Sequence, residues 1–300
     1  MKKILVICNL QKDILEEYNS KIKYIPNLSD CCQSDWEHAI KSVMPKIVLY
    51  GTGYFTKDMI ATWRNYLPNE KLYIVRKGVS LSRCDLDAAK NYSITVLNTP
   101  GINSIFVANY MSQFLFKENK KFDRVAIIGV GKIGKNVAIE AEKNKVDTIL
   151  YSKTLKNNFD LDIIKSENKI KNSHSQIAKN LEEAFSTSNK IAISLPLDKD
   201  TNAIINANHI DLIRKGSVLV SASSPHIFTD EALRTLYDRN DIFVVIDHLK
   251  SELEETYKII WHTDLLRENF IMDEKAAASP ECQQAMSLAA IKKCIDLENS

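Results

Sequence analysis

Residues 125–134 have the sequence Val125-Ala-Ile-Ile-Gly129-Val-Gly131-Lys-Ile-Gly134, in which an apolar run leads directly into three glycines. The apolar run predicts a buried parallel strand, and the spacing Gly-x-Gly-x-x-Gly is typical of a dinucleotide-binding turn. In such a turn the first glycine permits the sharp bend, the second lets the backbone approach a pyrophosphate, and the third lets the next helix pack on the strand. That helix, from Lys132 to about Lys143, would direct the positive end of its dipole at the phosphates. The alternative is a glycine-rich strand–helix turn that binds nothing.

The composition is that of a globular protein large enough for two domains: 300 residues, 45% hydrophobic and 26% charged. A net charge of +2 gives no support for a nucleic-acid or membrane surface, and the longest apolar runs have the length of strands. The start of the chain runs from apolar residues into charged ones without a small-residue cleavage site, so it predicts a first strand and not a signal peptide. The cysteines are scattered, which favours reduced thiols, a cytoplasmic protein and no metal site.

Short apolar runs alternate with segments of helical period, a pattern that predicts a parallel α/β architecture. The expected strands are 3–7, 47–50, 72–75, 94–97, 124–128, 148–151, 190–194, 217–220 and 242–246. The expected helices include one opened by a capping box at Ser34 and Glu37, one capped by Thr56, and the segments 105–116, 133–143, 175–185, 206–213, 230–239 and 281–297. The last of these could fold back onto the first domain.

More than a hundred residues precede the glycine turn, enough for a separate domain. We expect residues 1–100 and 280–300 to form one domain and residues 101–279 to form the domain that carries the turn.

Four stretches carry a more specific pattern. They are Arg76-Lys-Gly-Val-Ser-Leu-Ser-Arg-Cys-Asp85 with Asn98-Thr-Pro-Gly101, the glycine turn itself, Ser194-Leu-Pro196-Leu-Asp-Lys-Asp-Thr201, and Lys215-Gly-Ser-Val-Leu-Val-Ser221 with Asp230-Glu-Ala-Leu233. In this order and spacing they resemble the D-isomer-specific 2-hydroxyacid dehydrogenase family. The resemblance implies two doubly wound parallel-sheet domains, with a Rossmann nucleotide-binding domain inserted into a flavodoxin-like substrate domain, and a homodimer.

The resemblance also implies hydride transfer between NAD(P) and a small 2-oxo or 2-hydroxy acid, aided by an Arg, a Glu and a His. Glu252 stands where the family has its Glu, but Ser223 or Ser224 stands at the place of the Arg, and Glu274 at the place of the His. Serine offers no bidentate cation for a carboxylate. Glutamic acid has an ordinary pKa of about 4.3 against about 6.5 for histidine, so Glu274 would need apolar neighbours to act as an acid near neutral pH.

Some equipment for binding a small anionic substrate is kept. Gly78, Val79 and Ser80 match the loop whose backbone N–H groups hold the substrate carboxylate in the family. Lys77 precedes this loop, and we interpret it as the substitute cation, with Arg76 and His226 as further candidates. The alternative for Lys77 is a solvated surface lysine.

The residues that the resemblance places around the coenzyme are Gly129, Gly131, Lys132, Ile133, Gly134, Ser152, Lys153, Pro196, Thr201 and Asp247. NAD-specific relatives carry an acidic residue at the end of the second strand of this domain, where this chain has Ser152 followed by Lys153. Without the carboxylate a 2′-phosphate is not repelled, and a nearby cation attracts it. The sequence therefore favours NADP(H) modestly over NAD(H).

Two functions remain open from the sequence. The first is an NAD(P)-dependent oxidoreductase with a non-standard catalytic set made of Lys77, Glu252, Glu274 and Ser224. The second is a catalytically degenerate NAD(P)-binding sensor or protein-interaction module on the same fold, because a fold alone does not establish a reaction.

Overall fold

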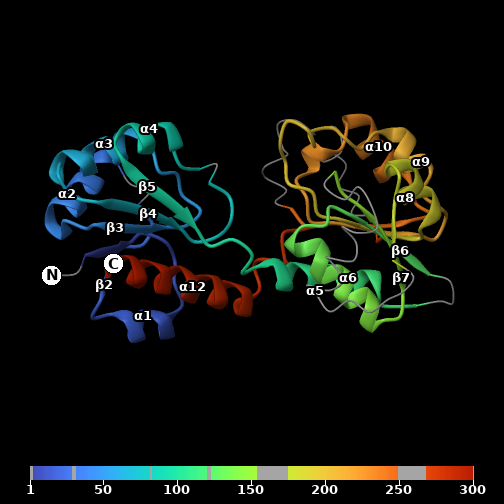
Figure 1. The fold of residues 1–300 in the computed structure, drawn as a ribbon, viewed down its shortest axis with the longest axis horizontal. Helices are drawn as coiled ribbons and strands as arrows, with labels where there is room; N and C mark the ends of the chain where they lie inside the picture. Colours follow the sequence, from blue (N-terminus) through green and yellow to red (C-terminus); the bar gives the residue numbers. More distant parts are fainter. Residues whose placement is uncertain are drawn as a thin grey trace. The chain divides into compact units, whose positions relative to one another are not determined.

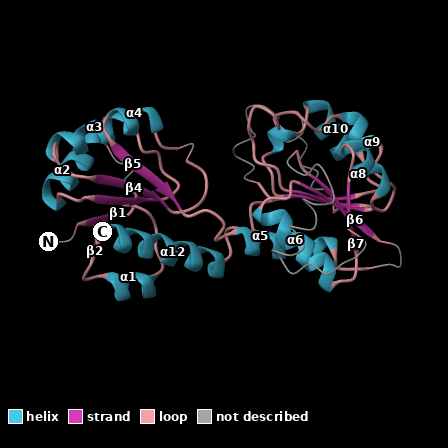
Figure 2. Ribbon diagram, viewed as in Figure 1, coloured by secondary structure: helices cyan, strands magenta, loops and turns pink. Residues whose placement is uncertain are grey.

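The computed structural model describes residues 3–28, 32–81, 83–119, 123–153, 175–248 and 268–299. The chain divides into two compact units (Figure 1), one made of Met1–Asn103 with Pro280–Ser300 and the other of Ser104–Ser279. Each unit is built on its own parallel sheet covered by helices (Figure 2), so the predicted fold class is confirmed.

The first unit contains a five-stranded parallel sheet in the order β2-β1-β3-β4-β5. Its strands are β1 (Ile4–Val6), β2 (Ile22–Tyr24), β3 (Ile47–Tyr50), β4 (Leu72–Arg76) and β5 (Ile94–Asn98). Its helices are α1 (Lys12–Tyr18), α2 (Gln33–Val43), α3 (Lys57–Tyr66), α4 (Leu86–Asn91) and α12 (Pro280–Glu298). The short edge strand β2 and helices α1 and α4 were not predicted.

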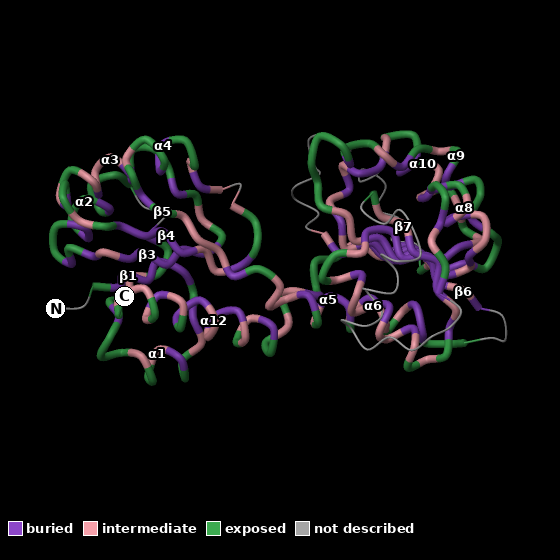
Figure 3. The backbone as a smooth tube through the Cα atoms, in the orientation of Figure 1, coloured by how far each residue is buried: buried purple, intermediate pink, exposed green. Residues whose placement is uncertain are grey.

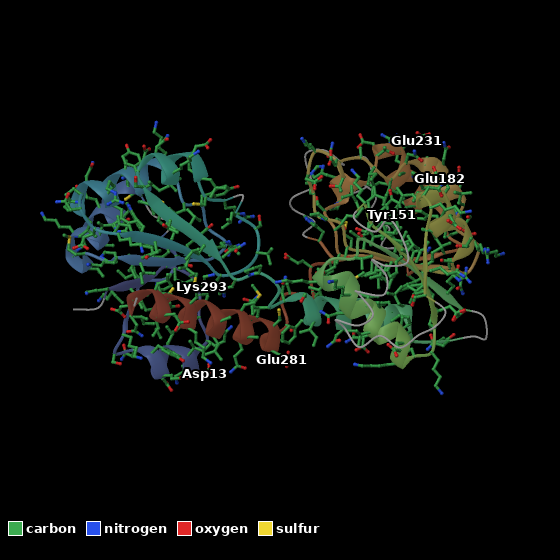
Figure 4. All side chains as sticks on the ribbon, viewed as in Figure 1. Asp13, Tyr151, Glu182, Glu231, Glu281 and Lys293 are labelled. Carbon is green, nitrogen blue, oxygen red and sulfur yellow. The ribbon has the colours of Figure 1, made fainter. Side chains whose placement is uncertain are left out.

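Both faces of this sheet are apolar because its strands are continuous hydrophobic runs. Side chains alternate along each strand, so Leu5 packs with the core formed by α2, α3 and α4, whereas Ile4 and Val6 pack with the core on the other face. That second core contains Ile291 of α12, as expected for a last helix that folds back onto the first domain. Among the hydrogen bonds that hold α12 there, Lys293 Nζ (labelled in Figure 4) donates to Asn98 O at 2.9 Å, and Gln284 Nε2 donates to Asp13 Oδ2 at 2.7 Å.

The second unit contains a seven-stranded parallel sheet in the order β12-β11-β10-β9-β6-β7-β8. Its strands are β6 (Arg124–Ile128), β7 (Asp147–Tyr151), β8 (Gln176–Ile177), β9 (Lys190–Ile193), β10 (Val218–Ser221), β11 (Phe243–Ile246) and β12 (Phe270–Met272). Its α-helices are α5 (Ser104–Leu115), α6 (Lys132–Lys143), α8 (Leu181–Thr187), α9 (Ala207–Asp211) and α10 (Asp230–Asp238). Helices α5 and α6 cover one face of the sheet, and α8, α9 and α10 cover the other. The central strands of both sheets are buried (Figure 3).

Two local expectations were wrong. The capping box at Ser34 does not form: helix α2 takes Cys32 as its N-cap, and Glu37 accepts a hydrogen bond from Tyr66 Oη at 2.8 Å instead. The helix expected at 175–185 begins only at Leu181, because the Asn180 side chain caps it through Glu183 N at 2.9 Å. The residues before it, Gln176–Ile177, form β8 on the edge of the sheet.

Among the described residues, no helix combines the length and the hydropathy that crossing a bilayer would require. This agrees with the strand-sized apolar runs seen in the sequence.

Candidate functional site

The glycine turn lies where the strand order of the second sheet reverses. Strand β6 lies between β7 and β9, and the chain leaves β6 toward one neighbour and later returns to the other side. Ligands of open α/β sheets bind beyond the carboxyl ends of the strands at such a point. Gly129 N donates to Tyr151 O at 2.9 Å (Tyr151 is labelled in Figure 4), and Ser194 Oγ donates to Gly129 O at 2.9 Å. The turn is thus tied to the ends of both neighbouring strands.

The three glycines are required for three different reasons. Gly129 has φ of +95°, and a Cβ at this position would lie 2.6 Å from Ser194 O. A Cβ on Gly134 would lie 2.0 Å from Gly129 O, so this glycine lets α6 pack closely on β6. A Cβ on Gly131 would meet no atom within 4 Å. The protein itself therefore leaves space at the second glycine, where a dinucleotide diphosphate approaches the backbone.

Helix α6 begins directly after Gly131, its N-cap residue, and its first residue Lys132 is exposed while Ile133 is half-buried. The N-cap residue Gly131 has no side chain that could accept a hydrogen bond from the first N–H groups of the helix. These N–H groups and the helix dipole suit an anion. The turn therefore fits the diphosphate of a dinucleotide.

Ser152 and Lys153 follow β7, as the sequence predicted for the ribose end of the site. Ser152 is half-buried and Lys153 is exposed. The Lys153 Nζ atom donates to Asp200 O at 3.0 Å and lies 3.8 Å from Asp200 Oδ2. This ion pair was not foreseen, because the two residues are 47 positions apart in the sequence.

The segment from Pro196 to Thr201 is a turn stabilised by its own side chains. Buried Thr201 donates its hydroxyl to Pro196 O at 2.5 Å and accepts from Asp198 N at 2.9 Å. Asp198 Oδ1 accepts the backbone N–H groups of Asp200 at 2.8 Å and of Thr201 at 3.0 Å. These N–H groups, that of Asp200 first, lower the pKa of the Asp198 carboxyl. Thr201 thus shapes the loop from inside, while Pro196 is exposed on it.

Asp247 follows β11 and holds the turn that contains Glu274. Its Oδ1 atom accepts the N–H groups of Lys275 at 2.8 Å and Ala276 at 3.0 Å. Burial raises the pKa of Asp247, and these two hydrogen bonds oppose that rise. The sequence placed Asp247 around the coenzyme, and in the structure its carboxylate anchors this turn.

Glu274 is exposed. Glu274 therefore lacks the apolar neighbours that would be needed for it to act as an acid near neutral pH. Tyr110 on α5 lies near the same turn: burial, followed by the charges of Asp247 and Asp273, raises its pKa. No pattern in the sequence indicated a role for this tyrosine.

At the position of the family's arginine the two serines differ. Ser223 is buried and its Oγ accepts a hydrogen bond from Leu195 N at 2.7 Å, so its acceptor role serves the fold. Ser224 is half-buried at the start of the 3-10 helix Pro225–Ile227. His226 in that helix uses its backbone oxygen to accept from Ala203 N at 2.8 Å.

Lys77 lies in the first unit, directly after β4. Its Nζ atom donates to Asn9 O at 2.9 Å and to Gln283 Oε1 at 3.2 Å. Burial lowers its pKa, and the charge of Arg76 lowers it further. Lys77 is half-buried, and within the described ranges no carboxylate forms an ion pair with it.

The loop after Lys77 is only partly available to a ligand. Gly78 has φ of +124° and is buried, and its N–H donates to Thr99 Oγ1 at 3.0 Å. The prediction that the Gly78 N–H serves a substrate carboxylate therefore competes with an internal hydrogen bond. Val79 and Ser80 are exposed.

The remaining predicted residue, Glu252, lies outside the described residues. Within the described part of the chain, no group of three or more His, Cys, Asp or Glu side chains is arranged to hold a metal ion.

Comparisons with known proteins bear on this site. A family model described as the NAD-binding domain of D-isomer-specific 2-hydroxyacid dehydrogenases matches residues 108–272, just over half of the chain. Hydroxypyruvate reductase from Thermotoga maritima is 23% identical over 295 residues, which are 86% of this chain and 88% of that protein. The 2-hydroxyacid dehydrogenase homolog 2 of Schizosaccharomyces pombe is 25% identical over 217 residues, which are 63% of this chain and 60% of that protein.

Solved structures show the same fold. A protein described as a D-isomer-specific 2-hydroxyacid dehydrogenase from a Polaromonas species superposes with a TM-score of 0.76 at 16% identity, covering 100% of this chain and 97% of that one. An NAD⁺-bound 3-phosphoglycerate dehydrogenase from Entamoeba histolytica gives a TM-score of 0.70 at 22% identity, covering 99% and 96%.

Proposed function

Because this chain belongs to the family of D-isomer-specific 2-hydroxyacid dehydrogenases and contains its NAD-binding domain, we propose that it is an NAD(P)-dependent oxidoreductase. Its substrate would be a small 2-oxo or 2-hydroxy acid, or a related anion. The observation that carries the proposal is the glycine turn at the reversal of strand order, with open space at Gly131 and closed packing at Gly134. A turn that served packing alone would not need a glycine at position 131.

Several residues would hold the coenzyme, which supplies or accepts the hydride when bound. The N–H groups around Gly131, Lys132 and Ile133 would bind the diphosphate at the start of α6. Ser152 and Lys153 would lie at the adenosine ribose, where the missing carboxylate and the added cation favour NADP(H). Pro196, Thr201 and Asp247 would shape the walls of the coenzyme site.

Lys77 is our candidate for the cation that binds the substrate carboxylate and orients the 2-oxygen. An ammonium group has three N–H donors, and Asn9 O and Gln283 Oε1 accept two of them. The third is left for a ligand. Since the group is partly desolvated and has no carboxylate partner among the described residues, an anion placed beside it would gain a charge-assisted hydrogen bond.

The 2-oxygen must gain a proton on reduction of the acid and lose one on its oxidation. We assign this proton to one of two carboxyl groups, Glu252 and Glu274, with the Ser224 hydroxyl near the position of the family's arginine. The exposure of Glu274 gives it access to solvent protons but no apolar pocket.

The experiment is a panel of 2-oxo acids assayed with NADPH and with NADH, following the absorbance of the reduced coenzyme. Turnover of any acid supports the proposal. In the variant Lys77→Ala we expect KM to rise about 10- to 100-fold, because a hydrogen bond to a charged group is worth roughly 1.5–3 kcal/mol. Lys71→Ala is the matched control, since Lys71 is an exposed lysine just before β4, at the amino end of the same sheet. Equal KM values for Lys77→Ala and the control would remove Lys77 from the site.

A second function, the catalytically degenerate coenzyme-binding module, is favoured by two observations. A serine stands where relatives have an arginine, and Glu274 lacks the buried surroundings of an acid that works near neutral pH. Binding of a reduced coenzyme without turnover of any acid in the panel would support this function over the enzyme.

A further inference from the structure

The ion pair between Lys153 and Asp200 passes over the carboxyl end of β6. Lys153 follows β7, Asp200 lies in the loop that follows β9, and β6 lies between these two strands in the sheet. The contact therefore joins the two segments that flank the glycine turn. A nucleotide bound over this turn would meet the pair.

The position of Lys153 determines which part of a coenzyme it would meet. In dinucleotide folds the residues at the end of the second strand, about 20 positions after the glycines, contact the 2′ position of the adenosine ribose. Lys153 occupies this place, and its ammonium group attracts a 2′-phosphate. Asp200 places a carboxylate 3.8 Å from the same ammonium group.

The loop holds Asp200 in this position by its backbone. Its N–H donates to Asp198 Oδ1 at 2.8 Å, and its carbonyl oxygen accepts from Lys153 Nζ at 3.0 Å. Both contacts use main-chain atoms, so a change of the Asp200 side chain keeps them. The Asp198 carboxylate also lies near Lys153, but its Oδ1 atom already accepts two backbone N–H groups of the loop. Asp200 is thus the carboxylate that can be altered without loss of the loop.

We propose that Asp200 sets the selectivity between coenzymes with and without a 2′-phosphate, by partly neutralising the Lys153 cation that would attract the phosphate. The inference rests on the coenzyme binding given under the proposed function and adds to it the residue that limits the preference for NADP(H). The side chains of Lys153 and Asp200 are 53% and 60% exposed, so water screens their charges and the effect is several-fold in affinity.

The test is a fluorescence titration of full-length protein with NADPH and with NADH. In Asp200→Asn we expect the ratio of the two dissociation constants to shift about fivefold in favour of NADPH. In Lys153→Gln we expect it to shift about tenfold the other way, with NADH binding within twofold of the unaltered protein. When Asp200→Asn is added to Lys153→Gln, the ratio should shift by less than a further twofold, because the effect of Asp200 acts through the lysine.

Asp238→Asn is the matched control. Asp238 is an exposed carboxylate at the last residue of α10, and helices of this sheet run back toward the amino ends of the strands. It removes the same charge from the same unit, and the ratio should stay unchanged. Thermal unfolding of each variant checks that the fold is retained, and Asp200→Ser provides a second neutral side chain.

Three outcomes would overturn the inference. Protein that binds neither coenzyme removes the proposed function together with it. Protein that binds both coenzymes, with a ratio unaltered in Asp200→Asn and Asp200→Ser, removes the role of Asp200 and leaves the proposed function standing. An equal shift in the Lys153→Gln background would show that Asp200 does not act through the lysine.

Discussion

The substitution Gly131→Ala separates coenzyme binding from folding. Gly131 has φ of −80° and ψ of −162°, a conformation open to alanine, and its added Cβ would meet no protein atom within 4 Å. Alanine is a poorer N-cap than glycine by roughly 0.5–1 kcal/mol, but it stabilises the folded state by about 0.4–1 kcal/mol because it lowers the entropy of the unfolded chain. We therefore expect the free energy of unfolding to change by less than about 1 kcal/mol.

The effect on coenzyme affinity is expected to be much larger. The new methyl group would occupy the space in which the diphosphate contacts the backbone, and would push the phosphates away from the first N–H groups of α6. Loss of one or two charge-assisted hydrogen bonds at roughly 1.5–3 kcal/mol each corresponds to at least about a 10- to 100-fold loss of affinity. The same loss should apply to NADH and NADPH, because both carry the diphosphate.

Two other glycines provide controls, because alanine at either position should lower the stability of the fold, in contrast to Gly131→Ala. In Gly134→Ala the Cβ would lie 2.0 Å from the backbone oxygen of Gly129, so the variant should lose about 3 kcal/mol or more in unfolding free energy. This corresponds to a fall in Tm of at least about 6 °C. Gly216, in the turn before β10, has φ of +77° and open space around it, so Gly216→Ala should lose about 1–2 kcal/mol through backbone strain and keep coenzyme affinity.

Thermal unfolding and coenzyme titration on the same samples measure both quantities. A stable Gly131→Ala protein that binds NADH and NADPH within threefold of the unaltered protein would refute the assignment of this turn to a diphosphate.

Buried groups lead to two more predictions. The folded-state pKa of Asp247 is raised above its ordinary value near 3.8, so its ionisation opposes folding increasingly as pH rises above about 4. Asp247→Asn should therefore gain stability relative to the unaltered protein between acid and neutral pH. Asp247→Ala leaves two backbone N–H groups without an acceptor and should lose about 2–4 kcal/mol in urea unfolding. A variant Asp247→Asn that loses stability relative to the unaltered protein as pH rises would contradict this sign. In a Cys31→Ser background, we expect one thiol, that of exposed Cys32, to react rapidly with a disulfide reagent at neutral pH. The buried thiols should react slowly, because burial raises the pKa of both Cys8 and Cys84 to about 11. A rapid reaction that persists after Cys32→Ser would show that a buried thiol is accessible.

The central strands of both sheets could be predicted because each is a continuous apolar run between turn or helix signals. Strands β3 and β6 have the predicted bounds, and β4 and β5 differ by one residue. Strands β8 and β12 have two and three residues, too few for a period, and their pairing to the edges depends on partners distant in sequence. Helix α8 begins at Leu181 because Asn180 caps it. Ser175, where the sequence predicted the start, is an equally plausible N-cap by residue type.

The shape of the glycine turn was predictable for a similar reason. The conformation and packing of Gly129, Gly131 and Gly134 follow from backbone geometry that is local to ten residues. The contacts of Lys77 and Lys153 could not be predicted, because their partners lie up to 206 positions away in the sequence and no local pattern indicates a pairing.

Two lysines with different surroundings, the buried Lys190 and the half-buried Lys77, bear on the substrate side of the site. Lys190 is almost completely buried, but its ammonium group lies 3.2 Å from Asp123 Oδ2 and donates to three oxygens at the end of α5 and just after it. Its charge is compensated, so it stabilises the structure around it. Lys77 has two neutral acceptors, a neighbouring cation in Arg76, and no carboxylate among the described residues. A partly desolvated cation without a counter-charge costs stability, and such violations of folding rules concentrate at functional sites. If that cost is not compensated inside the protein, the compensation is expected from an anionic ligand. Lys77 therefore supports a site that binds an anion in the first unit, which the enzyme requires.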